Sequence, residues 1–222
     1  MSSKNSQQHS LPISGKIETE GQQKEMRRLN VGILLFNEVE VLDFAGPFEV
    51  FSLAENVETQ MKCFRVFTFA EYASPVSARN GLRVCPDYTF DDVPEMDILI
   101  VPGGYGAEAI EINNQKLLNC LKTAEGRVDT LASVCTGAFL LAEAGILQDQ
   151  TVTTHWMDLE ALQNRYPKLT VIGDVKFVDQ GKILTSGGIS AGIELSLHIV
   201  ARYAGAETAA KTAKRMAYDV TA

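Results

Sequence analysis

The sequence predicts an α/β fold in which a mostly parallel sheet carries helices on both faces. Short runs that are apolar at nearly every position, such as LNVGILLF at 29–36 and DILIV at 97–101, are typical of strands buried on both faces. Helical stretches of about ten residues separate such runs, as connections between parallel strands require. The 222 residues, 45% hydrophobic and 22% charged, suit one domain with a full core.

Taken in chain order, residues 1–28 are rich in Ser, Gln, Lys and Glu, so we expect a flexible N-terminal tail before a folded domain at 29–222. A helix at 48–54 is expected to begin behind Gly46-Pro47. The turn signal Asp179-Gln180-Gly181 predicts a hairpin between 171–177 and 182–185. The remaining pattern predicts strands at 63–70, 97–101 and 130–134, a strand or hairpin arm at 82–88, and helices at 114–125, 136–144, 159–166, 192–203 and 207–217.

Charge and cysteine usage narrow the classes of partner and location. A net charge of −8 and a pI near 5.0 disfavour nucleic acid and anionic membranes as partners. Neither a run of ~18 apolar residues nor an apolar signal region is found, so we expect no membrane span and, by default, a cytoplasmic protein. Four scattered cysteines, with no C-x-x-C pair, predict free thiols and no metal site.

Cys135 is the strongest candidate for a reactive residue. It lies in LASVCTGAFLL at 131–141, where an apolar strand ends and a helix of small and apolar residues begins. Helix N-termini stabilise thiolates through unpaired amides and the helix dipole, so the sequence predicts a lowered thiol pKa and donors for developing negative charge. Thr136 offers a hydroxyl beside the sulfur, and Gly137 allows close backbone approach. The alternative is an inert, buried cysteine.

Asp43, in VLDFAGP just beyond the first strand, is the candidate partner of Cys135, because both would lie at the same edge of a parallel sheet. Its apolar neighbours predict a raised carboxyl pKa and a role as proton donor; the alternative is a helix cap or Asx turn. At the same edge, Gly103 and Gly104 could offer amides to an oxyanion or form a plain turn.

Two further segments are candidates for the site wall. His155, in TTHW, could return to the site as a base or orienting group, although a lone histidine is more often structural. The run GGISAG at 187–192 includes Gly188 and Ile189 and lies between a predicted strand and a predicted helix. Because it lacks a full phosphate-loop pattern, we interpret it as a close-packed wall of the pocket.

Five motifs, in order from about residue 29 to 205, together resemble the ThiJ/PfpI superfamily: VGILLFNEVEVLDFAGPFEVF, DILIVPGG, SVCTGAFLLAEAGIL, TTHW and LTSGGISAGIELSLHI. The resemblance implies a class I glutamine-amidotransferase-like fold, which is a flavodoxin-like three-layer α/β/α sandwich. The pairing of L-D-x-x-G-P with V-C-T-G and T-T-H-W is most similar to the isocyanide hydratase branch. It implies Cys135 as nucleophile, Asp43 as its carboxyl partner, a homodimer, and no metal or organic cofactor.

The chemistry implied is hydration of a small electrophilic substrate. Cys135 would attack the terminal carbon of an isocyanide while Asp43 helps to protonate the adduct, and water would release an N-substituted formamide from the thioimidate. PfpI-type peptidases place His directly after the cysteine, whereas this chain has Thr136, which speaks against a contiguous Cys-His protease dyad. Loops at 56–61 and 105–114 are expected to shape the substrate pocket.

Two other functions share these motifs. A stand-alone ligand or redox sensor is suggested by similarity to the N-terminal domains of AraC-type transcription regulators, and because the chain ends at Ala222 we expect no DNA-binding domain after it. Glyoxalase- or deglycase-like chemistry is the third reading, and it would form lactate or glycolate from methylglyoxal or glyoxal.

Overall fold

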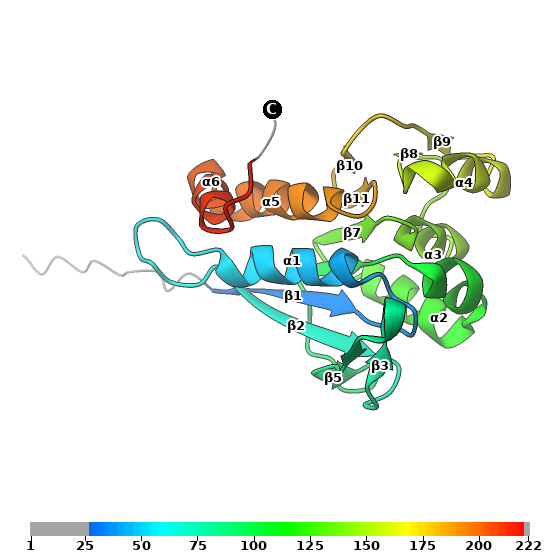
Figure 1. Ribbon diagram of the computed structural model, residues 1–222, viewed down its shortest axis with the longest axis horizontal. Helices are drawn as coiled ribbons and strands as arrows, with labels where there is room; N and C mark the ends of the chain where they lie inside the picture. Colours follow the sequence, from blue (N-terminus) through cyan, green and yellow to red (C-terminus); the bar gives the residue numbers. More distant parts are fainter. Residues whose placement is uncertain (1–26, 220–222) are drawn as a thin grey trace, which may run out of the picture.

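In the computed structural model, which describes residues 27–219, a seven-stranded sheet forms the centre of the molecule (Figure 1). Its order is β10-β11-β7-β6-β1-β2-β5, and every neighbouring pair is parallel except β10 with β11. The strands are β1 (Leu29–Leu34), β2 (Phe64–Ala70), β5 (Tyr88–Thr89), β6 (Ile98–Val101), β7 (Thr130–Val134), β10 (Phe177–Gln180) and β11 (Ile183–Ser186). Every residue of β6 and β7 is buried, which accounts for the unbroken apolar run of β6 and the mostly apolar sequence of β7.

Helices cover both faces of this sheet, so the predicted flavodoxin-like three-layer sandwich is confirmed. The helices α1, α5 and α6 pack against one another above the sheet in Figure 1, while α2 and α3 contact each other on the other face. The helices are α1 (Val41–Leu53), α2 (Gln115–Glu125), α3 (Gly137–Glu143), α4 (Leu159–Arg165), α5 (Ala191–Ala204) and α6 (Ala206–Arg215), with short turns η1 (Arg79–Gly81), η2 (Gly106–Ile110), η3 (Glu111–Asn113) and η4 (Trp156–Asp158).

Two small sheets lie outside the main one. The strand β3 (Val76–Ser77) pairs antiparallel with β4 (Arg83–Val84), and β8 (Thr151–Val152) pairs parallel with β9 (Thr170–Val171). The predicted single arm at 82–88 is therefore wrong as one element: its first half pairs with β3, and its last residue begins β5, which extends the main sheet beside β2.

The first helix begins earlier than predicted. It starts at Val41, so Asp43 lies in its first turn and Pro47 lies inside it. Gly46 is not the helix entry; a Cβ there would lie 3.0 Å from Ile193, which shows how closely α5 packs on α1. Burial of this face against α5 outweighs the usual cost of an internal proline. The alternative role of Asp43 as a helix cap is also wrong, because the N-cap residue is Glu40.

The predicted hairpin exists, but its first arm is shifted. The arm is β10 at Phe177–Gln180, so Asp179 and Gln180 belong to the strand and Gly181, with a φ of +83°, supplies the turn. Val171 instead ends β9 in the small sheet. The pattern located the turn, but the alternation at 171–177 was too weak to separate two short strands.

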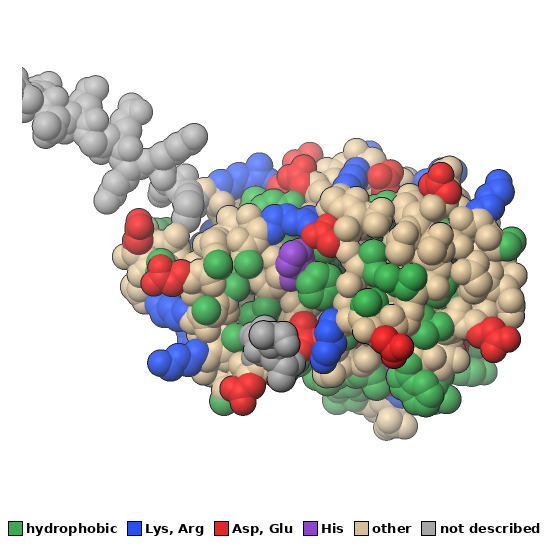
Figure 2. All heavy atoms as spheres, turned by 90° about the horizontal axis from the view of Figure 1, so that it is seen from above, with side chains coloured by type: hydrophobic (Ala, Val, Ile, Leu, Met, Phe, Trp, Pro, Cys, Tyr) green, Lys and Arg blue, Asp and Glu red, His purple; other side chains and the backbone are tan. Residues whose placement is uncertain are grey.

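The predicted tail lies outside the described residues except for Arg27 and Arg28. Within the described part, no helix is both long and apolar enough to cross a membrane. On the face in Figure 2, basic side chains are interspersed with acidic ones rather than gathered into a single positive patch. This face therefore has no positively charged patch of the kind that binds a phosphate backbone.

Candidate active site

The candidate residues converge because four neighbouring parallel strands end at one edge of the sheet. In the order β11, β7, β6 and β1, these strands are followed by Gly188, Cys135, Gly103 and Asp43, respectively. Parallel strands place their carboxyl ends together, which is where ligands bind in open α/β sheets. The edge lies at the end of the sheet toward which the β1 arrow points in Figure 1.

Cys135 occupies a strained turn between β7 and α3. Its φ of +55° lies in the left-handed region, which costs a non-glycine residue on the order of 1–3 kcal/mol. Two contacts hold it there: the Cys135 amide donates to the carbonyl of Ser186 at 3.1 Å, and the Thr154 hydroxyl donates to the Cys135 carbonyl at 2.8 Å. The side chain is buried, with 6% of the residue exposed. This is the geometry of a nucleophile presented on a sharp strand-to-helix turn.

Asp43 is fully buried beside this turn, with 0% exposure. Its Oδ2 accepts a hydrogen bond from the Gly103 amide at 3.0 Å, while its Oδ1 has no hydrogen-bond partner of ordinary geometry among residues 27–219. The pKa of Asp43 is raised to about 7: burial is the largest cause and the charge of Glu40 adds to it, while the hydrogen bond from the Gly103 amide opposes them. The predicted raised pKa agrees with this environment.

The thiol and the carboxyl interact directly. Burial raises the pKa of Cys135 above its ordinary value, and the negative charge of Asp43 adds to this effect; hydrogen bonding from the Thr136 amide lowers it by less. The prediction of a lowered thiol pKa was therefore wrong, because α3 is short and the sulfur is withdrawn from water. Above pH 7 the pair holds one proton, and this proton is on the thiol.

Gly103 and Gly104 do not offer free amides to an oxyanion. The Gly103 amide donates to Asp43, and the Gly104 amide donates to Oγ1 of Thr136 at 2.9 Å. The amide that interacts with the sulfur is that of Thr136, at the start of α3. Gly137 does allow close approach, because a Cβ there would lie 2.2 Å from the carbonyl oxygen of Val101.

The side chains of His155 and Cys135 both lie next to Gly188. A Cβ on Gly188 would lie 2.7 Å from Sγ of Cys135 and 2.6 Å from Cδ2 of His155, so both side chains border the space left by this glycine. His155 Nδ1 lies 3.2 Å from Oδ2 of Asp158. Of the glycines in the segment 187–192, Gly188 lies against Cys135 and Gly192 packs on Val134. Ile189, the residue after Gly188, is half-buried.

We expect Gly188→Ala to lower kcat/KM for any reaction of Cys135 by 10- to 100-fold, because the added methyl group must displace either the sulfur or the imidazole. Steady-state kinetics would measure this. Gly181→Ala is the control: nothing lies within 4 Å of the added carbon, so any loss that it causes comes from backbone strain at its positive φ and not from contact with the site. Equal activity of Gly188→Ala and the natural protein would contradict this packing.

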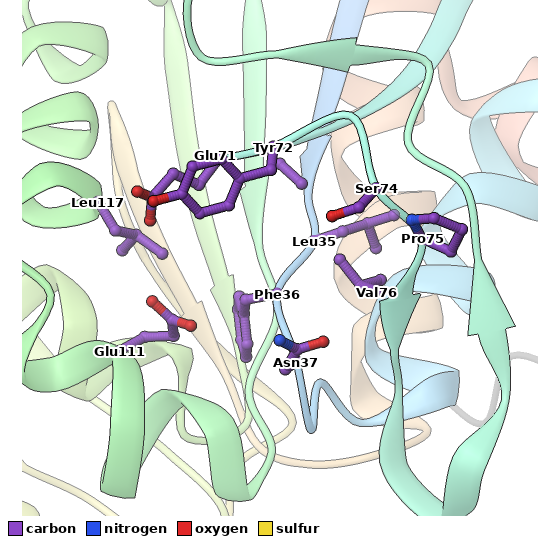
Figure 3. Close-up of a pocket in the computed structure, with 11 residues that line it drawn as sticks. Leu35, Phe36, Asn37, Glu71, Tyr72, Ser74, Pro75, Val76, Glu111 and Leu117 are labelled. Atoms are coloured by element: carbon purple, nitrogen blue, oxygen red, sulfur yellow. The ribbon is translucent and has the colours of Figure 1, made fainter.

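Two cavities lie near this edge. One of about 300 Å³ shares Thr154 and Gly188 with the Cys135 surroundings and continues to Trp156, Leu159 and Val175. The other, of about 90 Å³, lies at the ends of β1 and β2 and contains Glu71 and Glu111, whose carboxylates face a common space (Figure 3). The Asn114 side chain donates to both carboxylates at 2.7 Å, which ties this second group together without Cys135 or Asp43.

The predicted role of the loop at 56–61 in shaping the pocket is wrong. This loop connects the end of α1 to the start of β2, so it lies at the opposite edge of the sheet, where Gln60 accepts a hydrogen bond from Lys211 of α6. The segment 105–114 comes after β6 and therefore lies at the same edge of the sheet as Cys135, and its η2 turn packs on α3.

Sequence reasoning missed Asp158 and Thr154. Asp158 follows His155 by three residues, a spacing that brings side chains together within one helical turn, and this could have indicated the pair. Thr154 had no such signal, because its contact with the Cys135 carbonyl depends on the path of the chain after β8. Across residues 27–219, no three His, Cys, Asp or Glu side chains gather closely enough to hold a metal ion.

Comparisons with known proteins find relatives of this chain in both sequence and structure. The sequence profile of the DJ-1/PfpI family matches residues 29–202. The isonitrile hydratase of Pseudomonas putida is 32% identical over 182 residues, which are 82% of this chain and 75% of that protein. The HTH-type transcriptional regulator GbdR of Pseudomonas aeruginosa is 27% identical over 190 residues, or 86% of this chain; the match spans only 51% of the regulator. The fold resembles a ThiJ/PfpI family protein from Pseudomonas syringae, with a TM-score of 0.77 at 24% identity, over 96% of this chain and 84% of that one.

Proposed function

The chain belongs to the DJ-1/PfpI family, and from this premise we propose that it is a cysteine-dependent isocyanide hydratase, a lyase that converts isocyanides to N-substituted formamides. The observation that carries the proposal is the buried Cys135–Asp43 pair: the cysteine lies on a sharp strand-to-helix turn, and the fully buried carboxyl beside it has one oxygen without a hydrogen-bond partner among residues 27–219. The similarity to an isonitrile hydratase supports it, since isonitrile and isocyanide are names for one functional group.

The pair suits isocyanides because both new bonds in the first step form at the same carbon. The terminal carbon of R–NC accepts the sulfur and also a proton, so nucleophile and proton donor must converge on one atom. Cys135 gives its thiol proton to Asp43, the sulfur attacks the carbon, and Asp43 returns the proton to that carbon. The product is the thioimidate R–N=CH–S–Cys135, in which the former thiol proton is on the carbon and Asp43 is again a carboxylate; the pair regains its proton only when hydrolysis releases the thiol.

Hydrolysis completes the reaction. Water adds to the thioimidate carbon, the nitrogen gains a proton, and the C–S bond breaks to release R–NH–CHO and the Cys135 thiol. The Thr136 amide, which already interacts with the sulfur, stabilises negative charge as the thiolate departs. The balance is one isocyanide and one water consumed for each formamide formed, so this chain's own side chains are sufficient for every proton transfer.

A stand-alone ligand or redox sensor is the second candidate, and the similarity to a transcriptional regulator is the observation that favours it. A redox role is the weaker form, because a buried thiol whose pKa is raised oxidises slowly. Glyoxalase- or deglycase-like activity is the third candidate.

One assay separates the three candidates. It presents an aryl isocyanide, an alkyl isocyanide, methylglyoxal and glyoxal to the purified protein and identifies the products. Formamide as the main product supports the hydratase; lactate or glycolate supports the third reading; and no steady turnover supports the sensor.

We further propose that the chain forms a homodimer, as its resemblance to the family implies. Light scattering coupled to gel filtration should then give twice the chain mass of 24.3 kDa. A mass equal to one chain at micromolar concentration would contradict this proposal.

The four unpaired cysteines suit a reducing compartment, and we propose the cytoplasm as the location.

A further inference from the structure

The reaction proposed above needs a base for the incoming water, and this inference rests on that function. Asp43 is poorly placed for the task, because it is fully buried and no solvent reaches its carboxyl group. His155 lies on the other side of Cys135: it borders Gly188, which follows β11, whereas Asp43 follows β1 on the far side of β6. Its side chain is 18% exposed, so it can meet water that enters from solvent.

The orientation of His155 suits a base. Its Nδ1 faces the carboxylate of Asp158 at 3.2 Å, across three residues of the η4 turn. With Nδ1–H donated to Asp158, the other ring nitrogen, Nε2, carries the lone pair. The ring edge, through Cδ2, adjoins the same small space beside Gly188 that Sγ of Cys135 adjoins. Nε2 is bonded to Cδ2, so its lone pair lies one bond away from the ring atom that adjoins this space.

We propose that His155 is the catalytic base of the hydrolysis step and that Asp158 is its positioning residue. Nε2 takes a proton from water as the hydroxide oxygen bonds to the thioimidate carbon. The imidazolium then gives this proton to the substrate nitrogen, which leaves R–NH–CH(OH)–S–Cys135. Nε2 next accepts the hydroxyl proton while the C–S bond breaks, and the imidazolium returns that proton to the departing thiolate. Asp43 serves the first step and His155 the second, so the two halves of the reaction use opposite sides of the sulfur.

This division predicts that losing His155 traps the enzyme after its first step. In His155→Gln, one equivalent of isocyanide should bond to Cys135 at a rate within about threefold of the natural protein, whereas formamide release should slow on the order of 100-fold. Rapid quench followed by intact-mass measurement detects the trapped adduct, whose mass exceeds that of the protein by one isocyanide. Asp158→Asn should accumulate the same adduct to a smaller degree, and Asp158→Glu should restore most of the release rate.

His198→Gln is the matched control, since His198 pairs with Asp179 on the outer strand β10, away from Cys135. It should release formamide at the natural rate. Asp158→Asn tests the same step if His155→Gln does not fold. The inference is overturned if neither variant accumulates adduct, or if adduct formation slows as much as release. If the natural protein forms neither adduct nor formamide, the proposed function itself is wrong, which is a different outcome from a failure of the His155 role alone.

Discussion

Replacing Cys135 with alanine should abolish formamide formation, with kcat reduced on the order of 10⁴-fold or more. The reaction proceeds through a bond to Sγ, and no other thiol among the described residues adjoins Asp43. Alanine tolerates the left-handed φ of this turn about as well as cysteine does, so the fold should persist. Product analysis by liquid chromatography measures the loss, and circular dichroism checks the fold.

Cys85→Ala provides the matched control for this variant, because Cys85 is exposed and lies outside the site. Cys85→Ala should form formamide at the natural rate, and its Cys135 should react with isocyanide as fast as in the natural protein. If Cys135→Ala kept a tenth or more of the activity, covalent catalysis by this residue would be ruled out, whatever the other variants showed.

Replacing Asp43 with asparagine should lower kcat/KM on the order of 10²- to 10³-fold near neutral pH, because the proton shuttle of the first step is lost. The pH dependence identifies the group. Below about pH 7 both partners are protonated and Asp43 cannot accept the thiol proton; above it, the pair holds one proton and reacts. The natural kcat/KM should therefore rise through pH 7, and this rise should be absent in Asp43→Asn. A natural rate that fell over the same range would contradict the assigned role.

The same substitution has a consequence for stability with a definite sign. The folded pKa of Asp43, about 7, lies above its ordinary value of 3.8, so folding binds a proton in this range. The stability that this group contributes is present below pH 3.8 and is lost as pH rises to 7, above which burial of the carboxylate costs on the order of 4 kcal/mol. Asparagine still accepts the Gly103 hydrogen bond but carries no charge. Asp43→Asn should thus melt higher than the natural protein at pH 8.5, and the difference should shrink toward pH 5.

The sheet could be predicted from sequence because β6 is a continuous apolar run that is buried throughout, and β1 and β7 are mostly apolar and mostly buried. The placement of Cys135 and Asp43 at one edge then followed from the rule for parallel strands. The start of α1 could not be predicted, because Gly46-Pro47 has the local signature of a break and only the packing of α5 overrides it. Local signals are weakest where tertiary contacts decide the outcome.

The electrostatics of the site were predictable in part. The isolated carboxyl of Asp43 among apolar residues indicated a raised pKa, and burial produces it. The thiol of Cys135 was predicted wrongly, since the sequence places it at a helix start but does not reveal how far the turn withdraws it from water. The oxyanion role of Gly103 and Gly104 failed for a similar reason: their amides donate to Asp43 and Thr136, partners that lie far away in sequence.

We propose that Cys135 and Asp43 together hydrate an isocyanide. The most direct measurement is turnover of an aryl isocyanide by the purified protein in ¹⁸O-labelled water, with the formamide identified by mass spectrometry. We expect many turnovers per chain and one labelled oxygen in each formamide. Absence of formamide, while Cys135 still reacts with a thiol reagent, would contradict it and leave this buried pair to a sensor or to another cysteine-dependent reaction.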